Sequence, residues 1–148
     1  MANRQVLLAQ RPIGVIDATT TSLVETPIPV CGPGEALIKV GTLSIDPTIR
    51  GWMNDAPGYL PPIGVGEVVR SSGVGKVVDS QSPYYKVGDK VFGFANWQEW
   101  VIADEKNKLS VLPTGTGLEH APEALNLLFS GGNHGTTLVV VDDTVKLD

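Results

Sequence analysis

Three side chains capable of polar chemistry lie within five residues, in the segment Asp46-Pro47-Thr48-Ile49-Arg50. A carboxylate, a hydroxyl and a guanidinium at this spacing could line the rim of a site for a polar ligand. A structural interpretation competes with this one. Asp before Pro is typical of a helix start, with Asp46 as the N-cap and Pro47 at the first helical position, and Arg50 would then be a surface residue or pair with Asp46. The spacing alone favours the structural interpretation, and both stay open.

Apolar and aromatic residues could supply a wall for such a site. The candidates are Trp52, Met53, Tyr59 and Trp97. Aromatic side chains pack in protein cores more often than they contact ligands, so these residues alone do not indicate binding.

The pair Gly73 and Gly75 resembles the beginning of a dinucleotide-binding fingerprint. The third glycine is missing, and residues 76–79 continue as a strand where the fingerprint needs a helix. Tight bends in a small barrel explain these glycines better than a cofactor loop does. The sequence contains no phosphate-binding loop. It also contains no metal motif, because neither His120 nor His134 has a histidine or carboxylate partner at helical i,i+4 spacing.

The composition narrows the class of protein. With 148 residues, 42% of them hydrophobic, the chain can form one domain with its own core. Its 17 glycines and 11 prolines favour short segments joined by turns over a helical bundle. A formal net charge of −5 argues against a nucleic-acid partner and against adhesion to an anionic membrane.

Cysteine content and the first residues indicate a cellular compartment. Cys31 is the sole cysteine, so an intrachain disulfide is impossible, and one cysteine with two histidines is too few for a closed zinc site. The apolar run 6–9 is too short for a signal peptide or a membrane span. We therefore expect a cytoplasmic protein without a metal.

The expected elements are many strands, then one helix, then one strand. Apolar patterns and turn signals predict strands over 4–10, 22–26, 35–45, 66–70, 73–79, 91–94, 97–103 and 108–112, with a loop over 54–64. Helical spacing over 118–128, a stop at 131–132 and an apolar run at 138–141 predict a closing helix–strand unit. Strands in runs predict a mainly β (α+β) fold, a β-barrel with helical additions.

Several blocks resemble the zinc-independent branch of the medium-chain dehydrogenase/reductase superfamily, and within it the NADP-dependent alkenal, leukotriene and prostaglandin reductases. The blocks are LSIDPTIRGWM (43–53), GVGKVV (73–78), VGDKVFG (87–93), WQEW (97–100), GLEHAPEA (117–124) and GNHGTTLVV (132–140). The Asp-Pro-x-x-Arg block and the closing segment are the most specific, and the resemblance covers nearly the whole chain. It implies a GroES-like, partly open β-barrel with a few short helices and a C-terminal helix–strand unit.

The resemblance also implies roles for single residues. Asp46 and Arg50 match positions that shape the edge of the family's active site. Thr48 stands where many members have a tyrosine that contacts substrate or helps to protonate it, and a threonine hydroxyl is shorter and far less acidic. Asn133 and Gly135 match an Asn-x-Gly that touches the nicotinamide end of NADP. The implied substrate-side wall consists of Asp46, Thr48, Arg50, Met53, Tyr59, Trp97 and Asn133.

The family's cofactor domain has no counterpart in the sequence. Members carry a Rossmann domain between the barrel and the closing unit, whereas here the barrel side runs to 113 and the closing segment begins at 117. We expect a single GroES-like catalytic domain built from 1–113 and 117–148, joined near 114–116 where the cofactor domain would be inserted. A natural deletion and an engineered excision would both give this join, and the intact flanks favour excision.

Two functions from different classes follow. In the first, the chain is the substrate-side domain of an NADP-dependent reductase of α,β-unsaturated aldehydes or ketones, which binds no NADP and is inactive alone. In the second, it is a non-enzymatic GroES-like barrel, either a minimal domain or a binding module. Such a barrel could self-associate through the surface that a cofactor domain would cover.

Overall fold

One long strand connects most of the sheet. The computed structural model describes residues 2–58, 60–112 and 137–140. In it, β3 (Ala36–Ile45) pairs along its length with β4 (Ser72–Ser80), and all its partners are antiparallel. On its other side, the first half of β3 pairs with β6 (Trp100–Ala103) and the second half with β8 (Thr137–Val140). Two register shifts interrupt the β3–β4 ladder, and such irregularities bend a strand.

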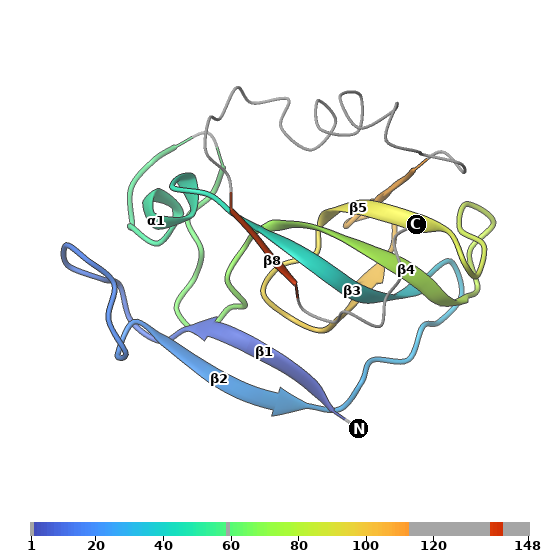
Figure 1. Ribbon diagram of the computed structural model, residues 1–148, viewed down its shortest axis with the longest axis horizontal. Coiled ribbons are helices and arrows are strands. Elements are labelled where there is room, and N and C mark those ends of the chain that lie inside the picture. Colours follow the sequence, from blue (N-terminus) through green and yellow to red (C-terminus); the bar gives the residue numbers. More distant parts are fainter. Residues whose placement is uncertain (1, 59, 113–136, 141–148) are drawn as a thin grey trace.

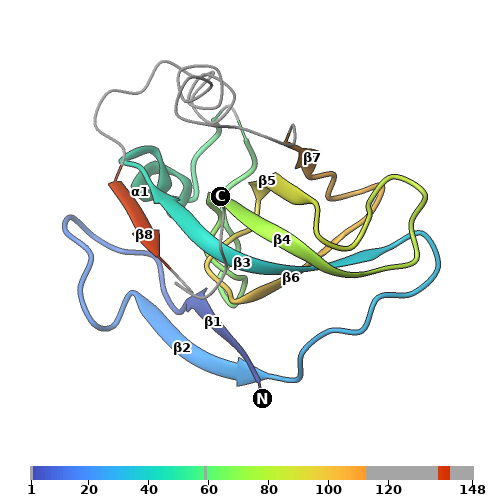
Figure 2. The same cartoon turned by 45° about the vertical axis from the view of Figure 1, so that its right-hand side comes forward.

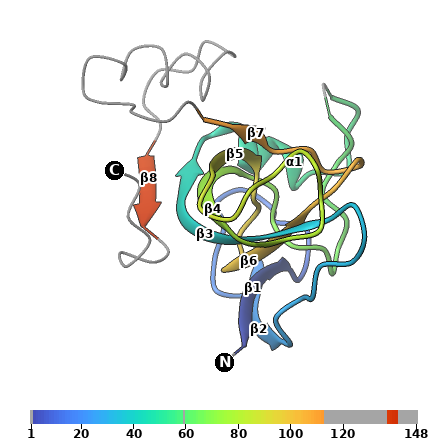
Figure 3. The same ribbon diagram turned by 90° about the vertical axis from the view of Figure 1, so that its right-hand side faces the viewer.

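The described strands form a barrel-like sheet and a separate two-stranded sheet. The larger sheet has the order β6-β3-β4-β5-β7, with β5 at Lys90–Phe94, β7 at Ser110–Val111, and β8 beside β3 (Figure 1). Seen at 90° to that view, β3, β4 and β5 curl around one another (Figure 3). The smaller sheet pairs β1 (Asn3–Leu8) with β2 (Thr21–Thr26), and isolated bridges link β1 to the 66–100 region. This is the predicted mainly β, GroES-like architecture.

Glycines allow β3 and β4 to approach closely. A Cβ atom on Gly75 would lie 2.5 Å from the carbonyl oxygen of Lys39, and one on Gly73 would lie 2.7 Å from that of Thr42. Both glycines lie inside β4, a strand of the barrel. Residues 76–79 continue as a strand, as predicted, but the two glycines lie inside this strand and not in a tight bend, and they serve the close approach to β3.

The core consists of two clusters joined by one side chain. The first lies within the larger sheet and includes Ile38, Val40 and Val91. The second lies beneath the short helix α1 (Thr48–Trp52), which follows β3 beside the beginning of β8 (Figure 2). Trp97 packs against both clusters, so its position couples the barrel to the region around α1. Among the described residues, no helix is long and apolar enough to cross a membrane.

The helix start differs by one residue from the prediction. The N-cap is Pro47, already in right-handed helical conformation, and the helix begins at Thr48. Asp46 still acts as a cap, because its Oδ1 accepts the backbone N–H of Thr48 at 2.8 Å. Asp46 thus caps the helix, as an Asp-Pro sequence predicts, but from one position further out.

The predicted strand at 66–70 is wrong. Gly66 has φ +90° and lies in a turn, and the segment contributes only an isolated bridge between Leu7 and Val68. Its backbone is bonded to β1 instead: the N–H of Leu8 donates to Glu67 O, and the N–H of Val69 donates to Val6 O. The apolar pattern of these residues therefore reflects packing against β1.

The predicted strand over 97–103 begins only at Trp100. Asn96 has φ 62°, which turns the chain before the strand starts. The backbone of Trp97 then bonds to Val69 O and to the N–H of Val6, so this stretch follows β1. Strands at 4–10, 22–26, 35–45, 73–79, 91–94, 108–112 and 138–141 are confirmed with boundary shifts of at most two residues. The helix predicted at 118–128 and its stop at 131–132 lie outside the described residues.

Candidate functional site

An apolar cavity of about 470 Å³ lies where β3 ends, between α1, the 14–16 loop and Trp97. We call it the α1 cavity. Its size falls in the range of small-molecule sites. It gathers four of the predicted site residues, Asp46, Arg50, Met53 and Trp97, and its full lining is Gly14, Val15, Ile16, Ile45, Asp46, Ile49, Arg50, Met53 and Trp97.

The Asp46 carboxylate and the Thr48 hydroxyl satisfy each other locally. Besides the backbone N–H of Thr48, Oδ1 of Asp46 accepts a short hydrogen bond from the Thr48 hydroxyl. Thr48 is exposed and does not line the α1 cavity, whereas Asp46 is half-buried at its edge. The geometry therefore gives Asp46 a place at the cavity and gives Thr48 a place in the cap.

Arg50 fastens a loop that forms one wall of the cavity. Its Nε and Nη2 donate to the carbonyl oxygen of Gly14 at 3.0 and 2.9 Å, and Nη2 also reaches Pro12 O at 3.3 Å. Nη1 donates to Oδ1 of Asn54 at 2.7 Å. A guanidinium presents five donors in a rigid fork, so one side chain can hold several carbonyls at once. Arg50 is thus a positioning residue for the loop.

A second arginine, missed by the sequence analysis, fastens the same loop from the other end. Arg11 donates through Nη1 to Met53 O at 2.9 Å and to Ile63 O at 3.0 Å. Arg50 thus reaches from α1 to the loop, and Arg11 reaches from the loop to the end of α1. The acceptors of Arg11 are backbone carbonyls, which every residue has, so the sequence does not reveal these hydrogen bonds. The sequence indicated only that the Arg11-Pro12 pair ends a strand.

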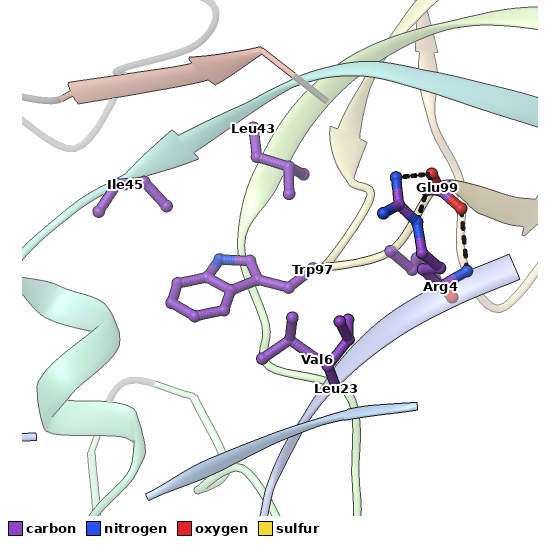
Figure 4. A pocket seen from close by; sticks show the side chains of 8 residues that line it. Arg4, Val6, Leu23, Leu43, Ile45, Trp97 and Glu99 are labelled. Carbon is purple, nitrogen blue, oxygen red and sulfur yellow. Dashed lines mark hydrogen bonds and ion pairs between the residues drawn. The ribbon is translucent and has the colours of Figure 1, made fainter. Parts of the chain in front are cut away.

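A second apolar cavity, of about 360 Å³, is also lined by Trp97. We call it the β1–β3 cavity; Figure 4 shows its lining side chains Arg4, Val6, Leu23, Leu43, Ile45, Trp97, Gln98 and Glu99. Leu43 and Ile45 lie on one side of the indole, and Val6 and Leu23 lie on the other (Figure 4). The indole N–H of Trp97 is buried and has no acceptor among the residues that the structure describes.

An ion pair closes one end of the β1–β3 cavity. Nη2 and Nε of Arg4 donate to Oε1 of Glu99 at 2.8 and 3.1 Å, and the backbone N–H of Arg4 donates to Oε2 at 3.0 Å. These hydrogen bonds are the main cause that lowers the pKa of the Glu99 carboxyl, and the carboxylate raises the pKa of Arg4 in return. The two charges compensate each other at the rim.

The remaining predicted site residues are not placed by the structure. Tyr59, Asn133 and Gly135 lie outside the described residues. Within the described residues, no group of three or more His, Cys, Asp or Glu side chains could hold a metal ion. Cys31 is buried, and this burial raises the pKa of its thiol.

Comparisons with known proteins identify the family to which this barrel domain belongs. A family described as the N-terminal domain of oxidoreductase matches residues 4–111. CurA from Vibrio vulnificus has a similar structure, with TM-score 0.73 and 34% identity, over 83% of this chain and 35% of that chain. A second structure of the same protein, in complex with NADPH, matches with TM-score 0.71 and 34% identity, over 82% of this chain and 35% of that one.

Two curated relatives are named as reductases. NADPH-dependent curcumin reductase of Escherichia coli (strain K12) is 39% identical over 101 residues, which are 68% of this chain and 29% of that protein. The NADP(+)-dependent 2-alkenal reductase of Nicotiana tabacum is 28% identical over 106 residues, 69% of this chain and 31% of that protein. The chain thus spans about a third of the length of the curated relatives it matches.

The chain belongs to the family of N-terminal oxidoreductase domains. Within the medium-chain dehydrogenase/reductase superfamily, it is a GroES-like domain of the NADP-dependent alkenal reductase branch.

Proposed function

We propose that this chain is the substrate-side domain of a zinc-independent, NADP-dependent reductase of α,β-unsaturated aldehydes or ketones, and that it acts in the cytoplasm. One observation carries the proposal: the α1 cavity is apolar, has the volume of a small-molecule site, and is bordered by Asp46 and by the loop that Arg50 holds. An apolar cavity with few polar groups suits a neutral, largely hydrophobic carbonyl compound. The names of the relatives, a curcumin reductase and a 2-alkenal reductase, agree with this substrate class.

We also propose that the described residues around the α1 cavity do not hold a dinucleotide. In the complete reaction, NADPH would supply the hydride, which is chemistry that belongs to the cofactor. A binding site for it needs donors directed at phosphate groups. The two guanidiniums next to the α1 cavity instead donate to backbone carbonyls: Arg11 to Met53 and Ile63, and Arg50 to Gly14. We therefore propose that the chain binds substrate, that it does not bind NADP alone, and that it has no turnover.

We further propose that 1–113 and 117–148 form one domain, joined where a cofactor domain would be inserted. The support comes from β8. This strand lies beyond the matched residues 4–111, yet it pairs in register with the second half of β3, from Ile45↔Thr137 to Thr42↔Val140. A strand that completes the sheet next to the α1 cavity is expected to unfold together with the barrel.

The test of substrate binding uses two neighbouring positions on the loop. Val15 lines the α1 cavity and is 88% exposed, while Ile13 is 99% exposed and does not line it. Calorimetric titration with 4-phenyl-3-buten-2-one, an aryl enone with one ring, should show saturable binding to the wild-type chain and to Ile13→Trp. Val15→Trp should weaken binding about tenfold, because the added ring narrows the cavity. Equal affinities for the two variants, or no binding by the wild-type chain, would contradict the proposal.

Exposed apolar residues give the alternative, a self-associating barrel, a specific basis. Ile13, Val15 and Val30 are each more than four-fifths exposed, and exposed apolar surface supports association when it forms a contiguous patch. Sedimentation over a range of concentrations tests this alternative. A strict monomer at high concentration counts against it and leaves the substrate-side domain as the sole proposal.

A further inference from the structure

We propose that the β1–β3 cavity is a second subsite, which binds the distal apolar arm of an elongated enone whose reacting part lies in the α1 cavity. The inference rests on the proposed function and extends it to the length and shape of the substrate. The substrate class is a neutral α,β-unsaturated ketone with two apolar arms, one on each side of the carbonyl.

The two cavities are neighbours with a common wall. Ile45 and Trp97 line both of them, and no other residue does. Figure 4 shows the indole of Trp97 between the β3 side chains and those of Val6 and Leu23. The proposed ligand would extend from the α1 cavity past Ile45 and Trp97 into the β1–β3 cavity.

The chemistry of the second cavity selects an uncharged, apolar group. Val6, Leu23 and Leu43 line it together with the two shared residues. Its one cation and one anion, Arg4 and Glu99, bond to each other at 2.8 Å and so offer no charge to a ligand. Leu23 is 67% exposed at the rim, so a ligand arm in the cavity would remove apolar surface from water on both partners.

The shared wall can adjust to such a ligand. The Trp97 backbone is fixed by hydrogen bonds to Val69 O and from Val6 N, both at 2.9 Å. Its indole N–H has no acceptor among the described residues, so packing alone holds the ring. A bridging ligand has to displace apolar contacts of the ring but breaks no side-chain hydrogen bond to a described residue.

The experiment compares two enones that differ by one ring. 4-Phenyl-3-buten-2-one carries one aryl arm and dibenzylideneacetone carries two. Calorimetric titration of the full 148-residue chain should give about tenfold tighter binding for the two-ring probe, since a second phenyl group is buried. If the one-ring probe binds and the two-ring probe is no tighter, the second subsite is overturned while the proposed function stands. If neither probe binds, both fall.

Two variants of β2 locate the second arm. Leu23→Trp adds bulk at the rim of the β1–β3 cavity, whereas Ser22→Trp adds the same ring at an adjacent exposed position that does not line it. The tenfold advantage of the two-ring probe should disappear in Leu23→Trp and remain in Ser22→Trp. The one-ring probe should bind both variants equally. Equal loss, or no loss, in the two variants overturns the subsite.

Methyl NMR of the unmodified chain gives a readout that does not depend on a variant folding. The two-ring probe should shift methyl resonances of Val6 and Leu23, which line only the second cavity, and of Val15 and Ile49, which line only the α1 cavity. The one-ring probe should shift Val15 and Ile49 alone. Unshifted Val6 and Leu23 with the two-ring probe, or shifts there with the one-ring probe, overturn the assignment of the arms.

Discussion

Arg50 and Gly14 are 36 positions apart, and two nitrogens of the guanidinium donate to the Gly14 carbonyl at 3.0 and 2.9 Å. Gly14 has φ +76°, a conformation that favours glycine, so its carbonyl is presented at a turn. The arginine of the Asp-Pro-x-x-Arg motif thereby acts on the cavity through the loop that it holds. Its geometry is that of a positioning residue.

Replacing Arg50 with Lys should loosen residues 12–16, which include the 14–16 loop of the α1 cavity. An ammonium cannot reproduce the forked hydrogen bonds to Gly14, Pro12 and Asn54. We expect a loss of about 1 kcal/mol in the free energy of unfolding and faster proteolysis within 12–16. Urea titration and limited proteolysis measure the two effects. Arg70→Lys is the control, because Arg70 bonds to one carbonyl, that of Pro61; equal cleavage of the loop in both variants would refute the positioning role.

Two glycines should respond in opposite ways to alanine. A Cβ atom on Gly75 would lie 2.5 Å from Lys39 O and 2.7 Å from Cγ2 of Ile38, so Gly75→Ala should destabilise by about 2–3 kcal/mol. Gly51 lies in α1 with no atom within 4 Å of an added Cβ, and Gly51→Ala should stabilise by about 0.5 kcal/mol. Urea unfolding of the matched pair decides; a neutral Gly75→Ala would argue against the close β3–β4 contact.

The Arg4–Glu99 pair should make stability depend on pH in one direction. Hydrogen bonding to Arg4 lowers the pKa of Glu99 in the folded protein. The stabilisation is therefore complete above the ordinary pKa of a glutamate, near pH 4, and is lost as the pH falls through the lower folded value. Glu99→Gln should reduce the urea midpoint at pH 7 slightly, because Arg4 is more than half exposed.

At a second, acidic pH the effect of the same substitution on the urea midpoint should shrink, because the wild-type carboxyl also becomes protonated as the pH falls through its lowered pKa. The exposed Glu105 gives a control, and Glu105→Gln should leave the midpoint unchanged at both pH values. A difference between Glu99→Gln and wild type that grows on acidification would have the wrong sign for this pair.

Trp97 should tolerate Phe better than its position between two core clusters suggests. Trp97→Phe loses packing volume between the two clusters. It also removes a buried N–H that has no acceptor among the described residues, and burying such an unpaired donor costs about 1–3 kcal/mol. We expect a net loss below about 1 kcal/mol in the free energy of unfolding. Trp97→Ala should lose about 3 kcal/mol, because it leaves a cavity between the clusters. Similar losses for the two variants would indicate that the N–H has an acceptor.

The barrel could be predicted from the sequence because its signals are local. Turn glycines, prolines and apolar alternation marked β4 and β5, and Asp46 before Pro47 marked the start of α1. The strand predicted at 66–70 failed because β-branched residues fit any extended segment that packs on a neighbour. Tertiary contacts decide which backbone groups bond to residues 66–70, and in this structure they are those of Val6 and Leu8.

The candidate site could be predicted in composition but not in geometry. Asp46, Met53 and Trp97, three residues of the implied substrate-side wall, line the α1 cavity, and their roles toward a substrate stay predictions. The fastening role of Arg50 and the participation of Arg11 escaped prediction, since their acceptors are backbone carbonyls of the 12–14 loop and of residues 53 and 63. The β1–β3 cavity also escaped it, because its walls come from strands far apart in the chain.

The central claim is that this chain carries a substrate cavity but does not bind the cofactor by itself. The most direct measurement is a pair of calorimetric titrations of the pure 148-residue chain, one with 4-phenyl-3-buten-2-one and one with NADPH, followed by an assay of NADPH oxidation with both present. We expect saturable binding of the enone, no binding of NADPH and no oxidation. Enone-dependent oxidation of NADPH by this chain would contradict it.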